Sequence, residues 1–184
     1  MTANIDSSAL QRLLDKDAIH ESLCRYARGV DRGDWDQVRS TYHPDAFDEH
    51  GDYKGGIDGL IEWLDKRFAG VDNSMHLLGN CLIEFAGPDL ALVETYFVSR
   101  RFMPAAGHAG AGPTDALARE AWGRYVDRFE RREGAWKVAH RTVVLEASSS
   151  SLALGGARRA GLRWGSRDRK DRLYEVQAEI FGRG

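Results

Sequence analysis

Two polar side chains in this 184-residue sequence, Asp31 and His76, have no evident structural use. An apolar helical stripe runs up to Val30, and the next predicted helix has its own capping pair, Asp34 and Gln37. Asp31 lies between the two helices and caps neither of them. A carboxylate near the C-terminal end of a helix is mildly disfavoured by the helix dipole. Asp31 is therefore a candidate for a role in chemistry.

His76 lies in a predicted strand over residues 73–85, on the same face as Leu78, Asn80 and Leu82. The opposite face of this strand would carry Met75, Leu77, Cys81, Ile83 and Phe85. A buried histidine needs a partner for at least one ring nitrogen, and for a lone histidine a backbone carbonyl is the usual one. Here Asp31 comes from the helix layer that should cover this face. A carboxylate on one imidazole nitrogen makes the other a better base, so the pair predicts general base catalysis.

The order of elements predicts an α+β fold in one domain. Helical patterns cover residues 6–14, 17–30, 35–43 and 57–69, with a break near Asp15. Two short strands fit residues 43–56, and two hairpins of long strands follow, with turns at residues 87–89 and 132–134. We expect a curved, cone-shaped antiparallel sheet whose concave face is covered by the N-terminal helices and encloses a pocket.

The domain is expected to span residues 1–147, followed by a basic, glycine-rich tail over residues 148–184. This tail would lie on the outer surface or on a neighbouring subunit and end in a short helix. The glycine-rich connection at residues 104–116 is a candidate lid. Buried sheet surface and the tail together favour a homo-oligomer, either a trimer or a dimer.

Composition excludes several classes of function. The net charge is −2, with 42% hydrophobic and 29% charged residues, which gives no electrostatic case for binding nucleic acid or an anionic membrane. No apolar run approaches the roughly 20 residues of a membrane span, and the start of the chain lacks a signal-peptide pattern. Cys24 and Cys81 fit no zinc or redox spacing. We therefore expect a cytoplasmic protein with reduced cysteines.

A metal site is not predicted. His43, Asp45 and His50 match no common ligand spacing, and Pro44 favours a turn after the short helix. The basic stretch near Trp164 is interrupted by acidic residues and is more typical of a solvated or subunit-contacting face than of an RNA site. The pocket itself is expected to be lined by aromatic and apolar side chains, namely Trp35, Tyr53, Leu78 and Tyr96.

Four segments together resemble one protein family: "RYARGVDRGDWDQV", "HPDAFDEHGDYKG", "SMHLLGN" and "RFERREGAWKVAHR". Their order and spacing over residues 8–147 are similar to the SnoaL-like branch of the nuclear-transport-factor-like superfamily. Hexachlorocyclohexane dehydrochlorinase, bile-acid dehydratase and scytalone dehydratase belong to this superfamily. The resemblance implies a His–Asp pair that removes a proton without a cofactor. The family's aspartate and histidine fall on Asp31 and His76, and the tyrosine of the bile-acid enzyme falls on Tyr26.

Arg141 shares a strand face with apolar residues and therefore needs an anion. Its partner could be Glu94 or Asp127 in a structural ion pair, or an oxygen of the substrate. The resemblance to the bile-acid enzyme implies the second role, in which Arg141 stabilises developing negative charge. That enzyme has a further aspartate on the strand after the histidine, whereas this chain has "VETYFVSRR" there, so steroid-like substrates are not indicated.

Taken together, the sequence predicts a cofactor-independent lyase or isomerase acting on a small hydrophobic carbonyl or hydroxyl compound. Dehydration, isomerisation and cyclisation all need the same base, so the residues do not distinguish between them. Two alternatives come from other classes. The chain could be a non-catalytic small subunit of a ring-hydroxylating dioxygenase, which the resemblance also covers, or a module that binds a metabolite without converting it.

Overall fold

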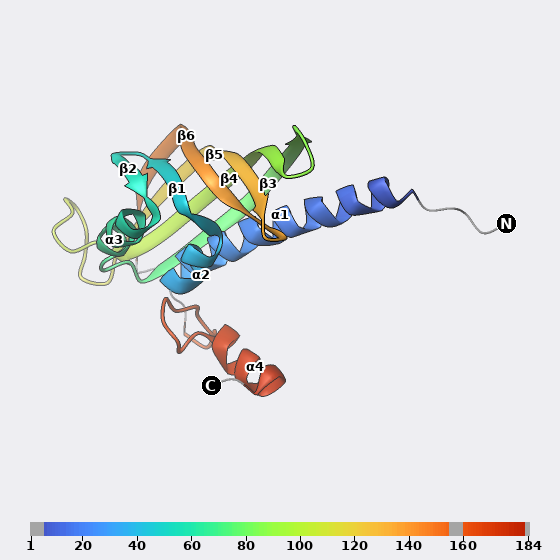
Figure 1. The fold of residues 1–184 in the computed structure, drawn as a ribbon. Coiled ribbons are helices and arrows are strands. Elements are labelled where there is room, and N and C mark those ends of the chain that lie inside the picture. The colour runs from blue at the N-terminus through green and yellow to red at the C-terminus, as the bar shows by residue number, and fades with distance from the viewer. Residues whose placement is uncertain (1–5, 155–159, 183–184) are drawn as a thin grey trace.

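A layer of helices precedes a single six-stranded sheet (Figure 1). The computed structural model describes residues 6–154 and 160–182. Its helices are α1 (Ser7–Arg32), α2 (Trp35–Ser40), α3 (Ile57–Arg67) and α4 (Arg172–Phe181). Its strands are β1 (Tyr42–His50), β2 (Tyr53–Gly56), β3 (Asn73–Phe85), β4 (Leu90–Pro104), β5 (Ala116–Arg132) and β6 (Ala135–Ala153).

The sheet is curved, and its strand order is β2-β1-β6-β5-β4-β3. The long strands β3 to β6 form antiparallel hairpins with turns at the two predicted places. The predicted α+β fold, with helices on the concave face, is confirmed. The expectation of a wholly antiparallel sheet is wrong at one pairing, because β1 enters beside β6 and runs parallel to it.

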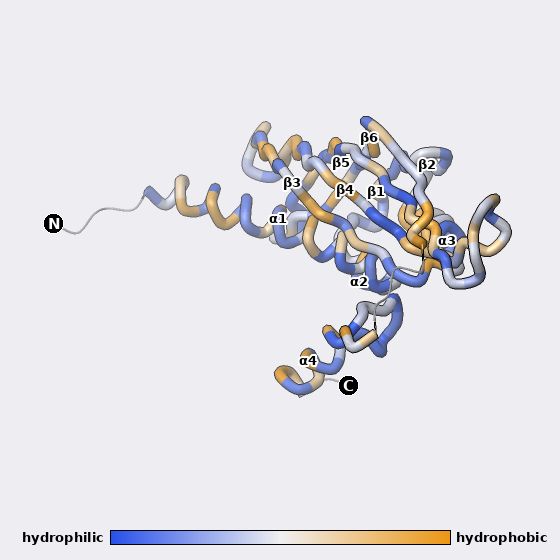
Figure 2. Tube along the Cα trace, turned by 180° about the vertical axis from the view of Figure 1, so that it is seen from behind, coloured by the Kyte–Doolittle hydropathy of each residue, from blue (hydrophilic) through white to orange (hydrophobic). Residues whose placement is uncertain are grey.

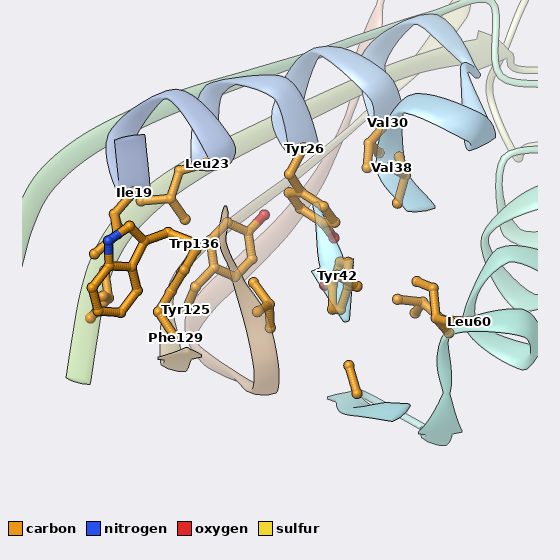
Figure 3. Packing of buried hydrophobic residues seen from close by; sticks show 14 of the residues in the cluster. Ile19, Leu23, Tyr26, Val30, Val38, Tyr42, Leu60, Tyr125, Phe129 and Trp136 are labelled. Atoms are coloured by element: carbon orange, nitrogen blue, oxygen red, sulfur yellow. The ribbon is translucent and has the colours of Figure 1, made fainter. Parts of the chain in front are cut away.

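The core lies between α1 and the concave face of the sheet (Figure 3). Ile19, Leu23, Tyr26 and Val30 form the buried stripe of α1 that the helical spacing predicts. Across from them lie the buried side chains of Tyr125, Phe129 and Trp136 from β5 and β6. The same stripe that holds α1 on the sheet therefore fixes the place of the residue that follows it, Asp31.

The predicted break near Asp15 is wrong, because α1 is continuous from Ser7 to Arg32. Asp15 is buried, and its carboxylate accepts hydrogen bonds from Trp136 Nε1 at 2.9 Å and Arg131 Nη1 at 3.1 Å. With these partners a polar residue is accommodated on the buried side of a helix. The first turns of α1 project beyond the sheet and carry exposed hydrophobic residues, drawn in orange in Figure 2.

The predicted faces of β3 are correct only for its first half. A β-bulge places an extra residue in β3, so that Leu78 pairs with Phe97 but Cys81 pairs with Thr95. One extra residue reverses which side chains point inward. Met75 and Leu77 are exposed before the bulge, whereas Ile83 and Phe85 pack on the core after it.

The segment containing His43 and Asp45 is also different from the expected turn, since it forms the start of β1. Its two possible metal ligands have other partners. His43 Nε2 lies 2.9 Å from the carbonyl of Glu130, and Asp45 forms an ion pair with Arg132.

The last strand continues past the expected domain boundary at residue 147, because β6 pairs with β5 as far as Ala153. Of the remaining tail, residues 160–182 are described, and they pack against the junction of α1 and α2 in the same chain. Asp171 lies 3.6 Å from Arg32, and Tyr174 donates to Asp34 at 3.2 Å. In the part of the chain described here, no helix is long and apolar enough to cross a membrane.

Candidate active site

A pocket opens between the C-terminal half of α1, the end of α3 and the concave face of the sheet. Both Tyr26 and His76 line it, and so do His50 and the aromatic rings of Phe97 and Tyr125. The enclosed volume is about 80 Å³, enough for several water molecules at about 10–15 Å³ each. A small molecule bound there would lie against the ring of His76.

The predicted pair of Asp31 and His76 is present in the structure, at the side of this pocket. Asp31 Oδ1 lies 2.7 Å from His76 Nδ1, and the side chain of His76 is only 8% exposed. An ionised carboxylate can only accept a hydrogen bond, so His76 Nδ1 must carry the proton that is donated to Asp31. The other ring nitrogen, Nε2, is then free to accept a proton.

Two further hydrogen bonds fix Asp31. The backbone N–H of His76 donates to Oδ2 at 2.7 Å, and Ser74 Oγ donates to Oδ1 at 2.8 Å. Burial opposes ionisation of Asp31, but the hydrogen bonds from His76 and Ser74 and the charge of His76 outweigh it, so the pKa lies below its ordinary value of 3.8. Asp31 is therefore held as a carboxylate beside the imidazole.

The end of α1 is stabilised by the tail. Arg167 Nη1 donates to the carbonyl of Val30 at 2.7 Å and to that of Asp31 at 3.3 Å. The Val30 carbonyl also accepts a hydrogen bond from the backbone N–H of Gly33, the C-cap, at 3.3 Å. A cation is favoured at this end of the helix dipole. Arg167 thus offsets the unfavourable placement of the Asp31 carboxylate that the sequence pointed out.

Tyr26, on the buried face of α1, lines the pocket. Burial raises the pKa of Tyr26 far above its ordinary value of 10, although the neighbouring charge of Arg141 opposes the shift. The hydroxyl therefore stays protonated at neutral pH and can serve as a hydrogen-bond donor rather than as a base.

Arg141 has its partner inside the protein. Its side chain is completely buried, and it donates to Asp127 through Nε at 2.8 Å and through Nη2 at 2.6 Å. The guanidinium lies between the rings of Tyr26 and Tyr125, at 4.3 and 4.1 Å from their centroids. Of the open alternatives for Arg141, the structure shows the ion pair with Asp127. The role implied by the resemblance is not supported, because Arg141 lies behind Tyr26 and does not line the pocket.

His50, considered above only as a metal ligand, lies beside an aspartate that the sequence analysis does not pair with it, Asp48. Asp48 Oδ2 accepts a hydrogen bond from Tyr42 at 2.7 Å, and the Tyr42 hydroxyl accepts one from Arg141 at 3.2 Å. Asp48 Oδ1 lies 3.6 Å from His50 Nδ1, and within the described residues neither atom has a hydrogen-bond partner. The sequence does contain a sign of this pair, because residues two apart in a strand, such as Asp48 and His50, point to the same face of the sheet.

Comparison with known proteins identifies the family of this chain. The family model described as "SnoaL-like domain" matches residues 11–142, most of the chain. The chain belongs to the SnoaL-like family. No curated protein sequence matches it. The predicted family is thus confirmed, while α4 and the segment that contacts the end of α1 lie outside the matched domain.

Solved structures similar to this SnoaL-like chain share its fold at low sequence identity. A hexachlorocyclohexane dehydrochlorinase (LinA) Type2 has a TM-score of 0.70 and 17% identity, over 84% of this chain and 99% of the other. A candidate scytalone dehydratase from Novosphingobium aromaticivorans has a TM-score of 0.66 and 16% identity, over 85% of this chain and 99% of the other. A cystatin-like protein of unknown function from Nostoc punctiforme has a TM-score of 0.53 and 17% identity, over 72% and 92%.

The four pocket-lining residues expected from the sequence lie elsewhere in this SnoaL-like chain. Trp35 donates from Nε1 to Asp65 at 2.9 Å, and Tyr53 donates to the carbonyl of Gly56. Leu78 packs on the core, and Tyr96 is 45% exposed on the outer face of β4.

The pocket-facing side of β4 instead carries Phe97, Ser99 and Arg101. This spacing of two was visible in the sequence, but the sequence did not show which face of β4 points inward. The glycine-rich connection at residues 104–116, the candidate lid, does not contact the pocket either, since none of its residues is among the described residues that line it.

Proposed function

We propose that this protein is a cofactor-free lyase of the dehydratase type. His76 Nε2 would take a proton from a carbon next to a carbonyl group, and the electrons of that C–H bond would form a double bond as a hydroxyl leaves the neighbouring carbon. The hydroxyl would leave as water after gaining a proton. The observation that carries the proposal is the buried Asp31–His76 hydrogen bond of 2.7 Å at the side of a pocket lined largely by apolar side chains.

Asp31 would hold the ring of His76 and stabilise the imidazolium formed in this step. Tyr26 would donate a hydrogen bond to an oxygen of the substrate, which its raised pKa supports. Arg141 would act indirectly, since its guanidinium lies against the ring of Tyr26. The proton for the leaving hydroxyl would come from His50, which also lines the pocket.

The substrate we propose is a small compound with an apolar body, because aromatic and aliphatic side chains such as Phe97, Tyr125 and Val143 form much of the wall. Family membership supports the same class of reaction, since similar structures are named as a dehydrochlorinase and as a candidate dehydratase. Both names describe the elimination of a small group.

The test is a panel of small β-hydroxy carbonyl compounds incubated with the purified protein in D₂O. Elimination gives a conjugated product that absorbs in the ultraviolet, and proton abstraction alone gives deuterium at the acidic carbon, visible by NMR. We expect activity in the wild type and in His108→Gln, whose histidine lies in an exposed turn, and loss in His76→Gln. Equal activity in His76→Gln would contradict the proposal, and tight binding of a panel compound with neither reaction would favour a ligand-binding module.

A further inference from the structure

Arginine side chains gather at one side of the pocket. Arg67, from the end of α3, and Arg101, from β4, both line it. The guanidinium of Arg101 lies 5.1 Å from the centroid of the Phe68 ring, and that of Arg167 lies 4.4 Å from the same ring. Phe68 thus contacts two cations, and it too lines the pocket.

The charges in this cluster repel one another. Arg101 is directly opposite Arg119 in the pairing of β4 with β5, a like-charged arrangement that destabilises a sheet. Burial and the charges of Arg67, Arg119 and Arg167 lower the pKa of Arg101 to about 10. Burial also lowers the pKa of Arg167 to about 10.

No ion pair relieves this repulsion within the described residues. Among the described residues, no carboxylate lies within salt-bridge distance of Arg67, Arg101, Arg119 or Arg167. By contrast, the neighbouring Arg100 on the same strand lies 2.7 Å from Glu120. The acidic side chains that act on Arg167 are Asp31 and Asp65, and they accept hydrogen bonds from His76 and Trp35. In a protein of net charge −2, this is a local concentration of positive charge for which the described part of the chain supplies no ion-paired carboxylate.

We propose that the substrate of this pocket carries an anionic oxygen group, a carboxylate or a phosphate, that binds Arg101 and Arg67 while its reactive carbon lies at His76. Guanidinium groups bind such oxyanions through paired, charge-assisted hydrogen bonds. Phe68 and Phe97 would contact the apolar body between the two ends. This inference rests on the proposed function, and it narrows the substrate class from any small compound with an apolar body to an amphipathic acid.

The test compares charged and neutral probes of one shape. Calorimetric titration of the full chain uses benzoate, phenyl phosphate and the neutral benzamide. The variants are Arg101→Gln and, as a matched control, Arg100→Gln, with Arg67→Gln as a second variant should Arg101→Gln fail to fold. Both anions share the proposed chemistry, and the one that binds more tightly identifies the group as carboxylate or phosphate.

We expect Arg101→Gln to weaken benzoate or phenyl phosphate binding by about 10-fold to 100-fold, the loss for a charge-assisted hydrogen bond, and Arg100→Gln to change it less than about twofold. Arg101→Gln should also raise the melting temperature without ligand, because it removes a repelling charge. Benzamide binding as tight as benzoate binding, or equal losses in the two variants, would overturn the proposal.

Calorimetric binding tests the anion site separately from the proposed lyase activity, because the probes can bind without being converted. If the panel reaction depends on His76 but the two variants bind benzoate alike, only the anion site is wrong. If Arg101 is needed for binding but no compound of the panel reacts, the proposed lyase activity is wrong and the anion site remains.

Discussion

Asp31 joins a helix to a strand in addition to orienting a histidine. It accepts hydrogen bonds from Ser74 Oγ and from both the backbone and the ring of His76, so it ties the end of α1 to the start of β3. An asparagine at this position would place an N–H₂ group, which is a donor, opposite one of these donors, so at least one of the hydrogen bonds would be lost. Replacing Asp31 should therefore cost stability as well as activity, about 1–3 kcal/mol for an unsatisfied buried group.

The lowered pKa of Asp31 makes its contribution to stability depend on pH. Because the pKa in the folded state lies below the ordinary value of 3.8, the contribution is complete above that value and is lost as pH falls through the folded pKa. The difference in unfolding free energy between wild type and Asp31→Asn should thus be constant near neutrality and shrink in acid. Urea denaturation of both proteins at a series of pH values measures it, and a difference that grows in acid would contradict the assignment.

Arg141 and Asp127 form the most deeply buried ion pair of the site, with both side chains completely buried. Arg141→Met should cost about 3–5 kcal/mol, since it leaves the Asp127 carboxylate buried without its partner, and adding Asp127→Leu should recover part of the loss. Arg25→Gln is the surface control, because its pair with Glu21 is exposed, and it should cost less than about 1 kcal/mol. Chemical denaturation gives these values, and equal costs for Arg141→Met and Arg25→Gln would show that the buried pair adds little.

At the residue scale, the sequence was informative where a side chain had no structural use. Asp31 and His76 stood out because neither capped a helix nor suited an apolar face, and they are indeed hydrogen-bonded. The pocket wall was not predictable in this way. Tyr96 and Phe97 are both aromatic, and only the sheet's curvature and its neighbours decide which one points inward.

At the scale of the elements, α1 and α2 meet at a glycine. A Cβ on Gly29 would lie 2.8 Å from Val38 Cγ2 and 3.0 Å from Val38 N, so α2 could not pack this closely against any larger residue. Gly29→Ala should cost about 1–3 kcal/mol through overpacking. Because Asp31 follows within the same turn of the helix, we also expect lower activity.

The matched control is Gly87→Ala in the turn between β3 and β4, where nothing lies within 4 Å of the added Cβ. This change should leave the unfolding free energy within about 1 kcal/mol of the wild type or raise it slightly. Thermal and chemical denaturation of the two variants provide the comparison. Equal stability of Gly29→Ala and Gly87→Ala would mean that the helices can move apart without cost.

The elements themselves were largely predictable because each has a repeating apolar pattern and clear turn residues. The exceptions were irregularities that only tertiary contacts create. The bulge in β3 moves Ile83 and Phe85 onto the core face. The continuous α1 depends on Asp15 bonding to Trp136, far away in the chain. Neither contact has a local signal in the sequence.

On the scale of the whole molecule, apolar surface remains uncovered. Met75, Leu77, Leu92 and Tyr96 are exposed on the outer face of the sheet. The projecting turns of α1 expose a second set, Leu10, Leu13 and Leu14 (Figure 2). Exposed apolar side chains that gather on one face are typical of an interface. We therefore predict a homo-oligomer, a trimer or a dimer, built on these surfaces.

Light scattering at micromolar concentration tests the oligomer, with Leu77→Asp as the disrupting variant and Glu133→Gln, in the turn between β5 and β6, as a control. Leu77→Asp should lower the molar mass towards that of a single chain, and Glu133→Gln should leave it unchanged. A monomer in the wild type would contradict the prediction.

If His76 and Asp31 act as one proton-abstracting unit, a double-mutant cycle will show that their effects on turnover do not add. Turnover is measured for the panel compound that the wild type converts fastest, using His76→Ala, Asp31→Asn and their combination, with circular dichroism to confirm folding. We predict that His76→Ala lowers the rate by about 10²–10⁴-fold, that Asp31→Asn is also severe, and that the double variant is little worse than the poorer single one. Full turnover in both folded single variants would contradict the account, and the pair would then be structural.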